Sequence, residues 1–228
     1  MADAYTARPL SPLRRAIAAR MIESKQSIPH FRVAVDLEVD ALMHFRRELR
    51  ERNPEVSVSL NDVLIKACAR ALMDVPAVNI QWAGTEIREY RSADVSVVMA
   101  LEGGGLSTPI IRAAESKSVC ELSREVRELG RRAARGALRM DEILGGTFSL
   151  SNLGMHGADR FDAIINPPQC AILAVGAATP RVVVTDERTT RIATMMTATL
   201  SCDHRAIDGA TGAKFLSALK HHIAYPVE

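Results

Sequence analysis

The sequence lacks the paired cysteines and long apolar runs that mark several protein classes. Its four cysteines lie far apart, with no C-x-x-C pair and no histidine at the spacing of a zinc site: Cys68, Cys120, Cys170 and Cys202. This distribution predicts reduced thiols and no metal site. No stretch resembles a signal peptide or approaches the roughly 18 apolar residues of a membrane span. We therefore expect a soluble protein of the cytoplasm or an organelle matrix, without a membrane partner.

A strong charge of one sign is missing as well. Lys and Arg total 29 against 27 for Asp and Glu, and the net charge of +2 is too small to indicate nucleic acid binding. Arginines recur every four residues from Arg127 to Arg139, but glutamates between Glu121 and Glu128 offer ion pairs along the same helix. A solvated helix face is the favoured interpretation. Gly103-Gly104-Gly105 has no phosphate-loop lysine beside it and predicts a plain loop.

What the sequence does contain is enough apolar material for one core. With 228 residues and 47% hydrophobic side chains, we expect residues 1–228 to form a single domain. Helical periodicity predicts helices at 11–21, 41–51, 61–73, 119–135 and 210–223, the first carrying a buried stripe of Leu13, Ile17 and Met21. Alternation and short apolar runs predict strands at 32–39, 94–100, 147–151, 171–175, 182–185 and 194–201. Mixed helices and strands indicate an α/β (α+β) two-layer sandwich.

A charged turn follows the last predicted strand and contains His204. Imidazole suits removal of a thiol proton, because its reference pKa is about 6.5 and that of a thiol about 8.5. A histidine in a polar turn is more often a structural residue, so the position alone does not decide its role. Asp208 stands before Gly209 at a helix start, where it can cap the helix, support His204, or do both.

A second candidate segment runs from a predicted strand into a glycine turn at Gly154. It leaves Ser151 and Asn152 at the edge of the strand. A serine hydroxyl there could donate a hydrogen bond to the oxyanion that forms when a thiolate attacks a thioester. The alternative is a serine that satisfies a turn amide, which is the more common case.

These segments together resemble the catalytic domain of the dihydrolipoamide acyltransferases of 2-oxo acid dehydrogenase complexes, most closely the pyruvate type. The resemblance rests on a series of motifs in the family's order: Ile28-Pro29-His30-Phe31, Leu60-Asn61-Asp62, Ile65-Lys66-Ala67, Asp94-Val95-Ser96-Val97, Leu106-Ser107-Thr108-Pro109-Ile110, Ser151-Asn152-Leu153-Gly154-Met155, Ile164-Ile165-Asn166-Pro167-Pro168-Gln169, and Asp203-His204-Arg205 with Asp208-Gly209. It therefore covers nearly the whole chain.

The resemblance implies a chloramphenicol acetyltransferase-like fold, with a mixed sheet and flanking helices, assembled as trimers. It implies transfer of an acyl group, with acetyl the expected one, between dihydrolipoamide and coenzyme A without a metal. His204 would be the general base, Ser151 on a neighbouring subunit the oxyanion donor, and Asp208 a supporting residue. Asn152 and Thr108 are candidate substrate-binding residues. The implied partners are a lipoyl domain and the decarboxylase and dihydrolipoamide dehydrogenase components.

Three departures from the family qualify these expectations. Lipoyl and peripheral-subunit-binding domains are absent from the sequence, so the lipoyl group would come from another domain or chain. Arg32 replaces an aromatic residue common in relatives. The C-terminus ends at Tyr225-Pro226-Val227-Glu228 without an apolar tail, which favours a trimer that forms a larger core weakly or not at all.

Three alternatives remain open at this point: another role, another mechanism and another acyl group. The chain could be a non-catalytic structural core subunit, although such relatives typically lose the catalytic histidine. Cys202, two residues before His204, could form a covalent acyl-cysteine. A branched-chain or acetoin-type acyltransferase would share most of the same motifs.

Overall fold

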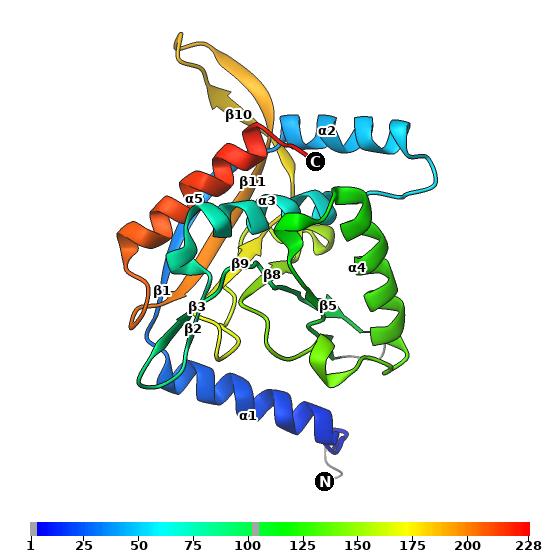
Figure 1. The fold of residues 1–228 in the computed structure, drawn as a ribbon, viewed down its shortest axis with the longest axis vertical. Helices are drawn as coiled ribbons and strands as arrows, with labels where there is room; N and C mark the ends of the chain where they lie inside the picture. Colours follow the sequence, from blue (N-terminus) through cyan, green and yellow to red (C-terminus); the bar gives the residue numbers. More distant parts are fainter. Residues whose placement is uncertain (1–3, 102–104) are drawn as a thin grey trace.

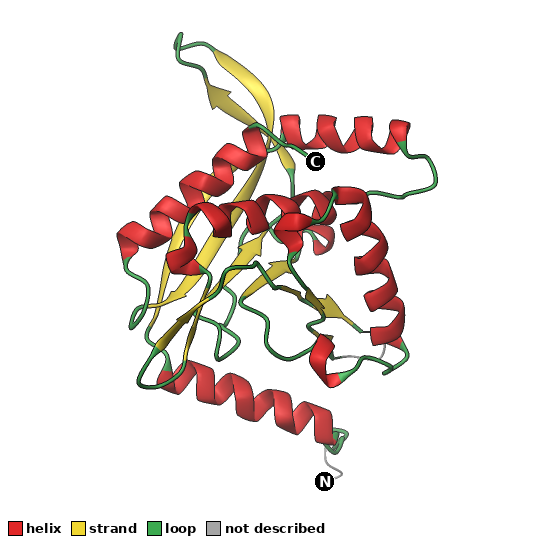
Figure 2. Ribbon diagram, viewed as in Figure 1, coloured by secondary structure: helices red, strands yellow, loops and turns green. Residues whose placement is uncertain are grey.

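The computed structural model describes residues 4–101 and 105–228, and a seven-stranded mixed sheet organises them. The strand order is β1-β11-β9-β8-β4-β7, with β10 paired to β11. Strands β4, β8 and β9 run parallel to one another, and β11 runs antiparallel to β9 and to β1. Figures 1 and 2 show most helices on one side of this sheet. The expected α/β two-layer sandwich is confirmed.

The elements follow the chain in alternating groups of helices and strands. The helices are α1 (Pro12–Ser27), α2 (Asp40–Arg52), α3 (Leu60–Asp74), α4 (Val119–Ala134) and α5 (Gly209–Ala224). The strands are β1 (His30–Glu38), β2 (Ile80–Trp82), β3 (Ile87–Glu89), β4 (Val95–Val97), β5 (Met99–Ala100), β6 (Leu106–Ser107), β7 (Ile110–Ile111), β8 (Phe148–Asn152), β9 (Ala171–Val175), β10 (Thr179–Val184) and β11 (Thr190–Asp203). Short 3-10 turns lie at Pro76–Val78, Ala114–Ser116, Met140–Glu142 and Gly154–His156.

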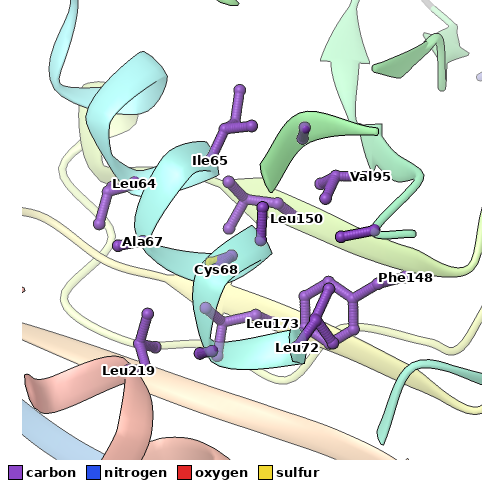
Figure 3. Packing of buried hydrophobic residues seen from close by; sticks show 14 of the residues in the cluster. Leu64, Ile65, Ala67, Cys68, Leu72, Val95, Phe148, Leu150, Leu173 and Leu219 are labelled. Carbon is purple, nitrogen blue, oxygen red and sulfur yellow. The ribbon is translucent and has the colours of Figure 1, made fainter. Parts of the chain in front are cut away.

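Helix α3 is the buried centre of the helical layer. Its start is fixed by a capping box, in which Ser59 accepts from the Asp62 amide and Asp62 accepts from the Ser59 amide. Five apolar side chains on its inner face are fully buried: Leu64, Ile65, Cys68, Ala71 and Leu72. Figure 3 shows this face packed over Phe148, Leu150 and Leu173 of β8 and β9. The core therefore lies between α3 and the middle of the sheet.

The opposite face of the sheet is covered by a loop rather than by a helix. Alternation along β9 turns Ile172 and Ala174 toward this side, where they pack with Ala163 and Ile165 of the loop. The loop crosses the sheet so closely that a Cβ on Gly176 would overlap the carbonyl oxygen of Asp159. This close approach holds the segment that follows β8.

The expected buried stripe on α1 was wrong. Ser11 caps the helix by accepting from the Arg14 amide, but Ile17 and Met21 are only half-buried. The side chain of Leu13 lies outside the described residues, as do Gly103 and Gly104 of the expected loop. Figure 1 shows α1 at one edge of the molecule, away from the helical layer. Periodicity predicted the helix correctly, but among residues 4–101 and 105–228 no segment fully covers the side that carries Ile17 and Met21.

The predicted solvated face on α4 is supported by ion pairs. Glu128 pairs with Arg131 at 2.5 Å, and Glu125 pairs with Lys117 at 2.5 Å.

No helix among the described residues combines the length and the apolar character needed to cross a membrane.

Candidate active site

His204 lies in the turn between β11 and α5, just beyond the last residue of the strand. Its backbone amide donates to the carbonyl oxygen of Pro29 at 3.1 Å. Its ring lies 4.6 Å from the ring of Phe31, tilted by 50°. The side chain is exposed, whereas the strand that leads to it is buried. The fold thus leaves the imidazole of His204 accessible at the end of a buried strand.

The same turn is held by the residues on either side of His204. Asp203 is fully buried, and both its oxygens accept from the guanidinium of Arg205, the shortest bond being 2.6 Å. Asp203 also accepts from the Arg205 amide at 3.0 Å. The hydrogen bonds to Asp203 raise the pKa of Arg205 above its ordinary value. The pair neutralises a carboxylate that would be costly to bury alone.

Asp208 caps helix α5. Its carboxylate accepts from the Thr211 amide at 2.7 Å, and this hydrogen bond lowers the pKa of Asp208. The capping role considered from the sequence is confirmed. Among the described residues, no hydrogen bond joins Asp208 to His204.

Cys202 is a poor candidate for a nucleophile. It is fully buried in the main core, and this burial raises the pKa of its thiol to about 12. A thiol with so high a pKa supplies almost no thiolate near neutral pH. Strand β11 ends at Asp203, so strand alternation does not point Cys202 and His204 to the same side. The structure therefore disfavours the acyl-cysteine alternative.

Ser151 lies on β8 and is 8% exposed. It faces the side of the sheet opposite α3, because strand alternation sends Leu150 into the main core. Asn152 points the other way, where its Oδ1 accepts from the Gly154 amide at 2.9 Å and its Nδ2 lies 3.4 Å from Asn61 Oδ1. These contacts hold the turn after Ser151 in place. A Cβ on Gly154 would meet the Gly176 backbone, so only glycine fits there.

Thr108 lies at the same end of the sheet as Ser151. The Val97 amide donates to the Pro109 carbonyl, and the Val98 amide donates to that of Leu150, which sets Thr108 level with the end of β8. Thr108 is half-buried and is two strands away from Ser151. Thr108 and Ser151 therefore lie at the same end of the sheet.

Within one chain, Ser151 and His204 do not meet. Ser151 is opposite Ala174 on β9, which is opposite Thr199 on β11. His204 follows Thr199 by five residues, and β11 runs antiparallel to β8. His204 therefore lies toward the end of the sheet opposite to Ser151. At about 3.4 Å per residue this separation is roughly 17 Å along the strands, with two strand spacings of about 5 Å added across them. Figure 1 shows the two ends: the β10–β11 hairpin at the top and the β11–α5 turn at the lower left.

His30 holds the loop behind the sheet and is expected to make stability depend on pH. Its Nδ1 lies 2.9 Å from the Ile28 carbonyl oxygen, and its Nε2 accepts from the Ile165 amide at 3.1 Å. Burial is the main cause that lowers the pKa of His30 below its ordinary value of 6.5, so the folded protein favours the neutral ring. The unfolded chain therefore binds more protons below about pH 6.5, and the free energy of unfolding falls as the pH drops below that value.

Urea unfolding between pH 5 and 8 measures this effect. His30→Gln, which cannot titrate, should unfold with a weaker acid-side decline than the unsubstituted chain. Equal declines in the two proteins would contradict the assignment.

Known proteins resemble this chain in sequence and in fold. Residues 2–228 match the family model described as 2-oxoacid dehydrogenases acyltransferase (catalytic domain). The chain belongs to this acyltransferase family. One relative is the dihydrolipoyllysine-residue acetyltransferase component of the pyruvate dehydrogenase complex of Rhizobium meliloti, 46% identical over 98% of this chain and 51% of its own. The chain thus spans about half the length of the curated relatives that it matches.

Solved structures agree with the assignment to the acyltransferase family. The dihydrolipoamide acetyltransferase of Azotobacter vinelandii, studied for the role of a serine, a histidine and an asparagine in catalysis, superposes with a TM-score of 0.92 at 28% identity over 98% of this chain and 93% of its own. The cubic core of a pyruvate dehydrogenase multienzyme complex gives the same values. A chloramphenicol acetyltransferase, 14% identical, covers 90% of this chain and 94% of its own with a TM-score of 0.58. The expected chloramphenicol acetyltransferase-like fold is confirmed.

Proposed function

We propose that this acyltransferase domain exchanges an acetyl group between dihydrolipoamide and coenzyme A, with His204 as the general base. The observation that carries the proposal is the exposed imidazole of His204, held at a strand end beside a cysteine too deeply buried to compete with it. Curated relatives of this chain are named as acetyltransferase components of pyruvate dehydrogenase complexes. Acetyl is therefore the group we assign.

The chemistry requires one proton to move twice. His204 takes the proton of the attacking thiol, and the thiolate adds to the thioester carbonyl. The resulting oxyanion accepts a hydrogen bond from Ser151. When the tetrahedral intermediate collapses, the other carbon–sulfur bond breaks and the leaving thiolate takes back the proton from His204. The products are one new thioester and one free thiol, so the step needs no oxidant and no metal.

Asp208 contributes as a positioning residue. Its cap on α5 fixes the end of the turn that begins at His204. In the Azotobacter enzyme the asparagine studied for its catalytic role stands four residues after the histidine, the same spacing as from His204 to Asp208. The equal spacing supports a corresponding role for Asp208, with a carboxylate instead of an amide.

The distance between Ser151 and His204 supports a site shared between copies of the chain. One copy would supply His204 and its neighbour Ser151, as expected for a trimer. A second feature favours association of the chain with itself: the hairpin of β10 and β11 extends past the sheet at the end where Ser151 lies. Its outer face exposes Val182, Val184 and Ile192 by 71–74%. Such an apolar face on a two-stranded ribbon needs a partner surface.

We also propose that a lipoyl domain delivers the dihydrolipoyl thiol, and that decarboxylase and dihydrolipoamide dehydrogenase components work beside this domain. The relatives' names place them in pyruvate dehydrogenase complexes, and a cubic core of such a complex has the same fold. Coenzyme A and the lipoyl group are substrates of the exchange.

A direct assay tests the proposed reaction. The purified chain is incubated with dihydrolipoamide and acetyl-, propionyl- or isobutyryl-CoA, and the acylated dihydrolipoamide is measured. We expect the fastest turnover with acetyl-CoA. Faster turnover with isobutyryl-CoA would overturn the acetyl assignment and favour a branched-chain enzyme. Absence of transfer from all three would overturn the enzymatic function and favour a structural core subunit.

A further inference from the structure

The ion pair beside His204 is covered by a side chain from a distant segment. The guanidinium carbon of Arg205 lies 4.6 Å from the ring centroid of Trp82, in β2. An arginine over an indole face is attracted by the ring's quadrupole, and the flat ring also limits how the guanidinium can rotate. Trp82 thus closes one side of the Asp203–Arg205 pair.

The backbone fixes Trp82 relative to the same turn. The Trp82 amide donates to the Pro168 carbonyl at 2.9 Å, and Gln81 and Gln169 form an isolated antiparallel β-bridge. Two residues after Pro168, the Cys170 carbonyl accepts from the Asp203 amide at 2.8 Å. One short segment therefore sets both the indole and the buried carboxylate in place, and the two meet at Arg205.

We propose that Trp82 is a positioning residue for His204, acting through Arg205 and Asp203 without touching substrate. The inference rests on the proposed function of His204. His204 stands between Asp203 and Arg205 in the sequence, and its ring lies against that of Phe31. Without the indole, Arg205 can turn away from Asp203, and the turn that carries the imidazole then loses a constraint.

Trp82→Leu removes the π face and keeps an apolar side chain. We expect kcat to fall by roughly 3- to 30-fold while the KM values for dihydrolipoamide and acetyl-CoA stay within about two-fold. The charged or titratable groups around this turn are unchanged by the substitution: His30 and Arg32 of β1, Cys170 before β9, and Asp208.

Two variants separate positioning from general destabilisation. Trp82→Phe keeps an aromatic face and should restore most of kcat. Ile87→Val changes the residue opposite Trp82 on the same hairpin and should behave like the unsubstituted chain. An unchanged kcat in Trp82→Leu would overturn the proposal, as would a change confined to KM. Failure of Trp82→Phe to restore activity would also overturn it.

A measurement independent of turnover distinguishes this proposal from the proposed function. Ring signals of labelled histidines are recorded by NMR at one pH, and those of His204 are assigned by their loss in His204→Ala. The His204 ring signals should shift or broaden in Trp82→Leu and return in Trp82→Phe. Unchanged signals in all three proteins would overturn the positioning role even if the enzyme is active. Shifted signals in a chain without transferase activity would support positioning while the proposed function fails.

Discussion

His204→Ala is expected to lower acetyl transfer between coenzyme A and dihydrolipoamide by roughly 100- to 10,000-fold, the usual contribution of a positioned general base. The reason is that a neutral thiol is a weak nucleophile, and no other described group at this turn can remove its proton. Cys202 is buried, Arg205 holds Asp203, and Asp208 accepts from Thr211. Steady-state kinetics with both substrates measure the loss.

Binding and a matched substitution complete this test. The affinity for coenzyme A, measured by calorimetry, should change little in His204→Ala, because the imidazole acts on the reacting thiol alone. Cys202→Ser, two residues away in the buried strand, should keep most of the activity. Near-normal turnover in His204→Ala would refute the assignment, and a trapped acyl-enzyme lost in Cys202→Ser would replace it with cysteine chemistry.

Much of the fold could be predicted because its signals are local. Helix α3 begins at a capping box and carries a continuous apolar face, and β9 is a short apolar run between turns. Both were predicted within one residue. Strands β2, β3, β6 and β7 were missed, because two or three residues are too few for a period to show.

Burial was harder to predict than secondary structure. The apolar residues of α1 have helical spacing, yet Ile17 and Met21 are only half covered. Spacing records which residues share a face, but not whether another surface reaches that face. The exposed Val182 and Ile192 of the hairpin show the same limit. Both sites are places where a second copy of the chain could complete the packing.

The candidate residues came from chemistry and resemblance, but their arrangement required the strand order. Nothing in the sequence shows that β9 lies between β8 and β11, or that β11 runs against both. The Arg205–Trp82 contact was missed for the same reason, since Trp82 comes more than 100 residues earlier in the chain. Arginine and aspartate flanking a candidate base were a sequence signal for the ion pair, but no local pattern indicated the indole.

The separation of Ser151 and His204 leads to a prediction for mixed assemblies. Ser151→Ala alone should reduce turnover by about 100-fold through the lost oxyanion donor. His204→Ala alone should reduce it by at least as much. When the two inactive variants are co-expressed in equal amounts, each site draws His204 from one copy and Ser151 from another. Half of the copies carry each intact residue, so about one site in four receives both, whatever the size of the closed ring.

Co-expression should therefore restore about a quarter of the unsubstituted activity from two nearly inactive variants. The control pairs His204→Ala with His204→Asn, which cannot complement because no copy carries the base. Activity per milligram is measured for both mixtures, and mass spectrometry gives the ratio of the variants. If the first mixture stays at the level of its parents, His204 and Ser151 do not act in a site shared between copies. Because the sheet places the two residues at opposite ends of one chain, that result would also remove Ser151 from the catalytic site.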